Sequence, residues 1–170
     1  MAGLNRRTGA GVALALLVAT GIGPSSAPPP LVVQPLPFNH QRHVEEGVGC
    51  TDCHSRAAIA AKAGHPLLKA CLLCHQEQKG ESAAEAKLRE FITAKTEVPW
   101  VRVNRLVGHV YFSHEAHVTR GQMDCAECHG DMKSKTTPTT ASQIDHLDMR
   151  ACMECHERRG AANDCITCHQ

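Results

Sequence analysis

Residues 125–129 read Cys-Ala-Glu-Cys-His, and residues 152–156 and 165–169 repeat the spacing as Cys-Met-Glu-Cys-His and Cys-Ile-Thr-Cys-His. Two further copies lie earlier in the chain, at residues 50–54 and 71–75. Together the five copies contain all ten cysteines of the 170-residue sequence. Each pair of thiols is therefore followed directly by an imidazole, and we expect this arrangement to determine how the chain folds.

The spacing Cys-x-x-Cys-His is the signature of covalent c-type haem attachment. Two thiols bond to the two vinyl groups of one porphyrin, and the next residue presents an imidazole to the iron, for which histidine is the usual proximal ligand. Disulfides, zinc sites and thioredoxin-like motifs also use paired cysteines, but five following histidines among only 12 in the chain favour haem. We predict five covalently bound haem c groups with their iron. The attachment residues are Cys50, Cys53, Cys71, Cys74, Cys125, Cys128, Cys152, Cys155, Cys165 and Cys168, and the proximal ligands are His54, His75, His129, His156 and His169.

The composition is typical of a core filled by a cofactor. Hydrophobic residues make up 42% of the chain, but aromatic residues only 3%. A domain of this size normally fills its core with large side chains, so we expect porphyrin to supply the missing bulk. The net charge of +1 gives no basic footprint for nucleic acid, and we expect no nucleic-acid partner.

Residues 1–30 have the layout of an export signal, with two arginines, an apolar run over residues 9–23 and then small residues and prolines. Cleavage after Ala27 would leave Pro28 at the new terminus, and the apolar run is shorter than the roughly 20 residues of a spanning helix. Two alternatives therefore stay open: a removed signal peptide, and a retained anchor that associates the chain with the membrane. Both place the remainder in the periplasm or at the outer face of the cytoplasmic membrane.

The exported part reads as a duplication. A first, dihaem unit over residues 31–77 has Phe-Asn-His-Gln-Arg-His at 38–43 before its motifs. A second, trihaem unit over residues 109–170 has Phe-Ser-His-Glu-Ala-His at 112–117 before its motifs. We expect a mainly α fold with much irregular chain, in which two duplicated units share a haem-packed core.

Residues 78–108 connect the two units. Apolar residues at helical spacing predict a packing helix within residues 78–95. Pro99 is expected to end the helical pattern, and the valines that follow indicate an extended connector.

Seven histidines outside the motifs are candidates for the distal position on five irons. In each His-x-x-His pair the two side chains share a helix face and can serve two different haems. His65 and His109 stay open as ligands, and His109 has the alternative of a hydrogen bond to a haem propionate. The expected distal ligands are His40, His43, His114, His117 and His146.

The order of these residues from His114 to His169 resembles the trihaem class III cytochromes c, the c3 and c7 type. In that family the first histidine of the pair serves the first motif, the second histidine serves the next motif, and the lone histidine serves the third. The first unit departs from the family pattern, because it has no third motif for His65. The resemblance implies the pairs His114–His129, His117–His156, His146–His169, His40–His54 and His43–His75.

Longer stretches resemble the pentahaem cytochrome c subunit of quinol:electron-acceptor oxidoreductases, the alternative complex III type. They are residues 38–40, 98–103 and 110–114, with the motifs at 71–75 and 125–130. The resemblance implies that the chain passes electrons from a membrane quinol site toward a periplasmic acceptor. Its partners would then be redox proteins, namely subunits of a membrane quinol oxidoreductase.

The leading interpretation is an electron carrier rather than an enzyme, because an iron with two histidine ligands has no open position for substrate. The alternative is a free periplasmic electron shuttle or storage cytochrome. A haem reductase is less favoured. Pentahaem nitrite reductases use lysine as the proximal ligand of their active haem, whereas every motif here ends in histidine.

Overall fold

The computed structural model describes residues 31–106, 108–140 and 148–169, so the predicted signal or anchor and His146 lie outside the described residues. Short helices joined by irregular chain make up this part, and its one β contact is a bridge between Val110 and His169. The expected fold class, mainly α with much irregular chain, is confirmed. The elements are α1 (His40–Glu45), α2 (Cys50–Cys53), α3 (Leu68–Cys71), α4 (Ala83–Ala94), the π-helix η1 (Ala116–Arg120), α5 (Ala126–His129), α6 (Met149–Arg159) and α7 (Cys165–Cys168).

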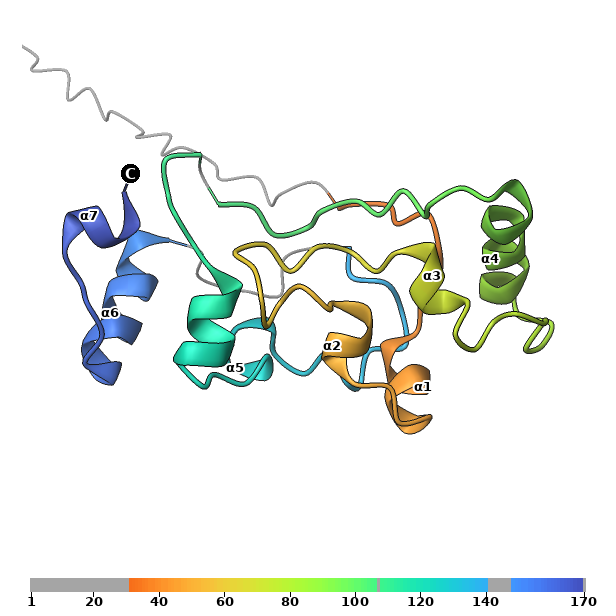
Figure 1. Ribbon diagram of the computed structural model, residues 1–170, viewed down its shortest axis with the longest axis horizontal. Helices are drawn as coiled ribbons and strands as arrows, with labels where there is room; N and C mark the ends of the chain where they lie inside the picture. The colour runs from red at the N-terminus through yellow and green to blue at the C-terminus, as the bar shows by residue number, and fades with distance from the viewer. Residues whose placement is uncertain (1–30, 107, 141–147, 170) are drawn as a thin grey trace, which may run out of the picture.

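The helices follow one another along the long axis of the molecule, but not in chain order (Figure 1). Helices α4 and α3 lie at one end, α1 and α2 come next, η1 and α5 follow, and α6 and α7 lie at the other end. The second motif, which begins in α3, therefore lies further out than the first. Within the described ranges no helix is long and apolar enough to cross a bilayer.

Four of the haem motifs close the same helical turn. In each, the N–H of the motif histidine donates to the carbonyl of the first cysteine, at 2.9 Å. The fourth motif lies within the longer helix α6. Because positions i, i+3 and i+4 share one face of a helix, the turn presents both thiols and the imidazole to the same side.

Helix α4 corresponds to the predicted packing helix, but it begins later and ends before Pro99. The backbone at Gly80 has a φ of 144°, which is not helical. The Ser82 hydroxyl then caps the helix by accepting from the N–H of Glu85 at 3.1 Å. At the other end Lys95 takes the left-handed conformation and stops the helix, so Pro99 is not the cause.

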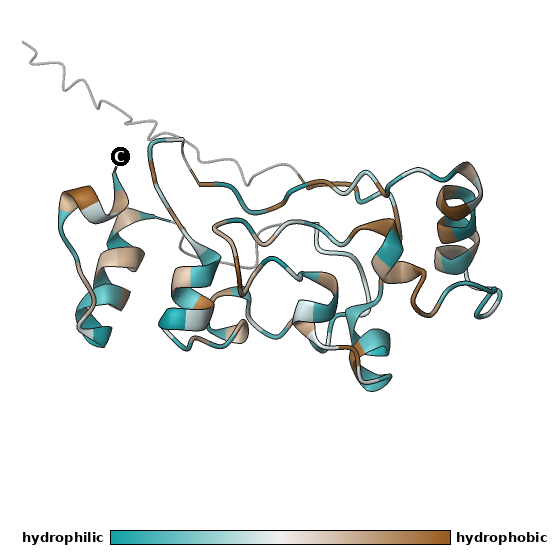
Figure 2. Cartoon of the chain, viewed as in Figure 1, coloured by the Kyte–Doolittle hydropathy of each residue, from teal (hydrophilic) through white to brown (hydrophobic). Residues whose placement is uncertain are grey.

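Buried hydrophobic side chains gather around the second motif. Figure 2 shows strongly hydrophobic residues on α4, which covers this region. In the described part of the second unit, only Ser113 is buried. The core consists of Leu36, Leu68, Leu88 and Val98, with Phe38, Cys71, Leu72, Phe91, Ile92 and Trp100 packed against it.

Hydrogen bonds join the two units at the start of the second histidine pair. The N–H of His114 donates to the carbonyl of Ala61, and the N–H of Glu115 donates to that of Ala60, both at 3.1 Å. The Thr119 hydroxyl donates to the carbonyl of Ala58 at 2.6 Å. The second pair is therefore held against the chain that follows the first motif.

Candidate haem-binding sites

None of the ten cysteines, which all lie within the described residues, forms a disulfide. Their neighbours connect motifs that are distant in sequence. Burial and the nearby Cys53 raise the pKa of the Cys71 thiol, which places the second motif beside the first. Burial and the nearby Cys50, which is also a hydrogen-bond partner, raise the pKa of Cys125. The first motif therefore lies between the second and the third.

The same relation extends through the second unit. Burial and the nearby Cys155 raise the pKa of the Cys128 thiol, so the third motif adjoins the fourth. Burial and the nearby Cys168 raise the pKa of Cys152, so the fourth adjoins the fifth. With the order of helices in Figure 1, the motifs form one row in the order second, first, third, fourth and fifth.

Three of the expected histidine pairs meet with the separation that one iron requires. A histidine nitrogen binds a first-row metal at about 2.0–2.1 Å with the ring centroid about 1.1 Å beyond, so two imidazoles on opposite sides of an iron have centroids about 6.3 Å apart. The residues present therefore fit a bis-histidine haem at the second, third and fourth motifs. The centroid separations are 6.3 Å for His43 and His75, 6.4 Å for His114 and His129, and 6.1 Å for His117 and His156.

Six of the candidate ligands hold their rings in place through Nδ1, which donates to a backbone carbonyl. This leaves Nε2 free, and metal-binding histidines usually donate their other N–H in this way. The donors and acceptors are His43 to Asn39 (2.8 Å), His54 to Gly64 (3.1 Å), His114 to Ala61 (3.1 Å), His117 to Ser113 (2.7 Å), His156 to Ala162 (2.6 Å) and His169 to His109 (3.4 Å).

The two His-x-x-His pairs have the same aromatic neighbour, Phe38 in the first unit and Phe112 in the second. Each phenyl ring stacks on the second histidine of its pair, with centroids 4.4 Å apart. Each also meets the first histidine edge-on, at 4.8 Å in the first unit and 4.9 Å in the second. The repeated geometry agrees with the duplication read from the sequence.

At the first motif, His40 lies within electrostatic reach of His54. Burial and the neighbouring His54 and His43 lower the pKa of His40. The Nδ1 atom of His40 is buried and has no hydrogen-bond partner among the described residues. His54 also lies near His129, whose pKa is lowered by burial, His114 and His54.

At the fifth motif the described neighbour of His169 is His109. Their ring centroids are 5.4 Å apart and their planes are inclined by 21°. The antiparallel bridge between Val110 and His169 brings the two segments together, and the N–H of Tyr111 donates to the carbonyl of Cys168 at 2.7 Å. His146, the residue expected to face His169, lies outside the described residues.

His65, the second open candidate, lies beside the first motif and is exposed. Partial burial, Arg102 and His54 lower its pKa. His65 and His40 therefore both lie near His54, the proximal histidine of the first motif.

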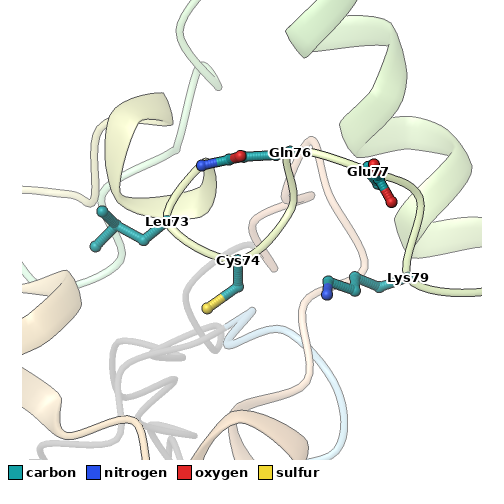
Figure 3. Close-up of a pocket in the computed structure, with 5 residues that line it drawn as sticks. All are labelled: Leu73, Cys74, Gln76, Glu77 and Lys79. Atoms are coloured by element: carbon teal, nitrogen blue, oxygen red, sulfur yellow. The ribbon is translucent and has the colours of Figure 1, made fainter.

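Two cavities adjoin motif residues. One of about 230 Å³ lies between η1 and α6 and is lined by His117, Cys155 and His156, so it opens between two expected ligands and an attachment thiol. Figure 3 shows the other, of about 380 Å³, where Cys74 and Lys79 point to the same open side of a loop. Each cavity leaves open space beside an attachment cysteine.

Sequence reasoning missed Glu85, which contacts the proximal histidine of the second motif. Its Oε2 lies 2.8 Å from Nδ1 of His75, and its Oε1 lies 3.3 Å from Nε of Arg89. The available signal was its position on α4, where Glu85, Leu88 and Ile92 fall on one face. An acidic residue on an apolar helix face indicates a buried partner.

Comparison with known proteins supports the same interpretation. Residues 110–170 match the family model described as cytochrome c7 and related cytochrome c. Over 161 residues the chain is 29% identical to the menaquinone reductase multihaem cytochrome c subunit of Nitratidesulfovibrio vulgaris, an alignment that covers 81% of this chain and 77% of that protein. Together with the five motifs and the facing imidazoles, these similarities identify the chain as a multihaem c-type cytochrome, an electron carrier related to the cytochrome subunits of quinone oxidoreductases.

Proposed function

We propose that the exported chain carries five covalent haem c groups and transfers electrons as a subunit of, or partner to, a membrane quinol oxidoreductase. When bound, each haem supplies an iron that gains or loses one electron. The facing histidine pairs, 6.1 to 6.4 Å between centroids, are the observation that carries the proposal. Two histidines on each iron leave no position for a substrate, which favours electron transfer over catalysis.

The proposed ligand set follows from the ring contacts. The motif histidines are the proximal ligands, and His40, His43, His114 and His117 are the distal ligands of the first four haems. For the fifth haem we propose His146. His109 is the alternative, although its ring centroid lies 5.4 Å from that of His169, closer than the about 6.3 Å of two imidazoles on one iron. Replacing each with alanine in turn distinguishes them, because only loss of the true ligand converts one iron from low to high spin.

The shared pair His114 and His117 gives the sharpest test of this set. His114 faces His129 and His117 faces His156, so each serves a different motif. Because a Met/His ligand pair raises the reduction potential, His117→Met should raise the potential of the fourth haem and His114→Met that of the third. If both substitutions change the same single haem in a redox titration, the shared-helix arrangement is wrong.

The domain organisation and route follow from the order of the motifs. We propose a dihaem unit over residues 31–77, a connector over 78–108 and a trihaem unit over 109–170. Electrons then pass along the row second, first, third, fourth, fifth, and the second and fifth motifs are its two ends. The side-by-side cysteines of neighbouring motifs support this order.

The partner is inferred from the relative, which is named as a subunit of a menaquinone reductase. By the same logic this chain would take electrons from, or give them to, a membrane quinone enzyme outside the cytoplasm. A free periplasmic shuttle or storage cytochrome is the alternative. The layout of residues 1–30 supports export in both cases.

Expression of the full chain in a host that attaches haem tests the whole proposal. Mass spectrometry should show five added haems, and paramagnetic resonance should show low-spin bis-histidine iron. Co-purification with membranes after a salt wash supports the oxidoreductase subunit, whereas release into the soluble periplasmic fraction supports the shuttle. Fewer than five haems, or mature protein in the cytosol with Met1 intact and haem attached, would contradict it.

A further inference from the structure

The second motif differs from the first, fourth and fifth in the group that faces Nδ1 of its proximal histidine. The proximal histidines of those three motifs, His54, His156 and His169, donate to neutral backbone carbonyls. His75 instead has the carboxylate of Glu85, with Oε2 2.8 Å from Nδ1. Nδ1 of His75 and the carboxylate are close but not aligned well enough to form a hydrogen bond. Glu85 therefore acts on the ring as an adjacent negative charge.

The carboxylate is held firmly, because it is buried at the start of α4. Glu85 is only 5% exposed. Its Oε1 lies 3.3 Å from Nε of Arg89 and accepts from the backbone N–H of Lys79 at 3.2 Å. Arg89 in turn donates to the carbonyls of His75 and Gln76, which ties the helix to the motif.

Burial makes the charge effective. A charge in the interior is screened far less than one in water, and it is tolerated only when it is paired. Arg89 partly neutralises Glu85 but lies on its other oxygen, so Oε2 remains directed at His75. Carboxylates that contact a metal-binding histidine make the imidazole a stronger donor to the metal.

We propose that Glu85 is a positioning residue for His75 whose buried carboxylate lowers the reduction potential of the haem attached at Cys71 and Cys74. The inference rests on the proposed function, because it requires iron on His75. The oxidised iron carries one more positive charge than the reduced iron, so a nearby negative charge stabilises the oxidised state more. The second motif, at one end of the row, is then tuned separately from its neighbours.

The test is a redox titration of the full haem-loaded protein with Glu85→Gln, which keeps the shape of the side chain but removes its charge. The equilibrium constant for reduction of one haem should increase about tenfold, which raises its reduction potential by about 59 mV for one electron. Nuclear Overhauser contacts with Leu73, between the two cysteines, assign the affected haem to the second motif. Glu90→Gln is the matched control, because Glu90 lies on the same helix but pairs with Lys87 at the surface.

The outcomes separate this inference from the proposed function. A rise at the second motif in Glu85→Gln but not in Glu90→Gln supports the inference. An unchanged potential with all five haems retained, or equal shifts in both variants, overturns it while the proposed function stands. Wild-type protein without haem at the second motif would overturn the proposed function itself.

A second variant covers the case in which Glu85→Gln does not retain the haem at the second motif. Glu85→Asp keeps the charge but withdraws it from Nδ1 by one methylene group. It should raise the equilibrium constant for reduction of the same haem by less than tenfold. Five haems by mass with an unchanged potential in Glu85→Asp would overturn the inference.

Discussion

Each unit carries one His-x-x-His pair followed by haem motifs, but the two are stabilised differently. The first unit, with the connector that includes α4, has a hydrophobic core of Leu36, Leu68, Leu88 and Val98. In the described part of the second unit, Ser113 is the only buried residue. We therefore expect the first unit to retain structure through protein contacts and the second to depend on bound haem for a core.

Removal of haem should have the largest effect on the difference between the two units. Chain produced without haem attachment should lose the second unit, because the described residues of that unit form no buried hydrophobic cluster, while α3 and α4 should remain partly protected. Hydrogen exchange measures both regions in one sample. Equal protection of residues 109–140 and of α4 in the haem-free chain would show that the two units do not differ in their dependence on haem.

Replacing one attachment cysteine in each unit tests the same difference between the two units. Cys128→Ser and Cys53→Ser should each remove one thioether bond and lower haem content by mass. We expect Cys128→Ser to lower the melting temperature of the second unit more than Cys53→Ser lowers that of the first. The reverse order would mean that the protein core around α4 contributes little to the first unit.

A cavity in the protein core should affect only the first unit. Leu88 is 5% exposed, so Leu88→Ala should cost about 2–5 kcal/mol in the free energy of unfolding. The optical signals of the third to fifth haems should stay unchanged. Val33→Ala is the control, because Val33 is 86% exposed and its truncation should cost less than about 0.5 kcal/mol.

Local sequence spacing predicted the motifs and the histidine pairs, because each is formed within one helical turn. Cys125, Cys128 and His129 come together through hydrogen bonds between near neighbours. Hydrogen bonds of this kind leave little freedom once the spacing is set.

The contacts between distant segments were not predictable in the same way. Glu85 reaches His75 because α4 packs back onto the second motif. His109 reaches His169 through an antiparallel bridge between distant segments. The spatial order of the motifs likewise depends on contacts between the units, and no residue type at a fixed spacing indicates it.

The π-helix that carries His117 provides a smaller test within the second unit. The N–H of Gly121 donates to the carbonyl of Ala116 at 2.9 Å and closes η1. A Cβ at this position would lie 2.7 Å from the carbonyl oxygen of His117. Gly121→Ala should therefore shift His117 and cost about 1–3 kcal/mol in the free energy of unfolding.

Gly108→Ala is the control for Gly121→Ala, because an added Cβ there meets no atom within 4 Å. Only Gly121→Ala should also change the low-spin signal of the fourth haem. Equal stability and spectra in both variants would show that η1 can relax around the added methyl group.

The smallest expected effect concerns the junction between the two units. The Thr119 hydroxyl donates to the carbonyl of Ala58 at 2.6 Å and is exposed. Thr119→Val removes this bond while keeping the side-chain shape, and should cost about 0.5–1.5 kcal/mol. Because the N–H groups of His114 and Glu115 donate across the same junction, their hydrogen exchange should become faster.

The control for Thr119→Val is Thr136→Val, at an exposed threonine for which the described chain shows no side-chain hydrogen bond. It should leave exchange at His114 and Glu115 unchanged. If the two variants gave the same exchange rates, the Thr119 contact would not contribute to the junction. The backbone bonds from His114 and Glu115 to Ala61 and Ala60 would then hold this junction without the side-chain bond.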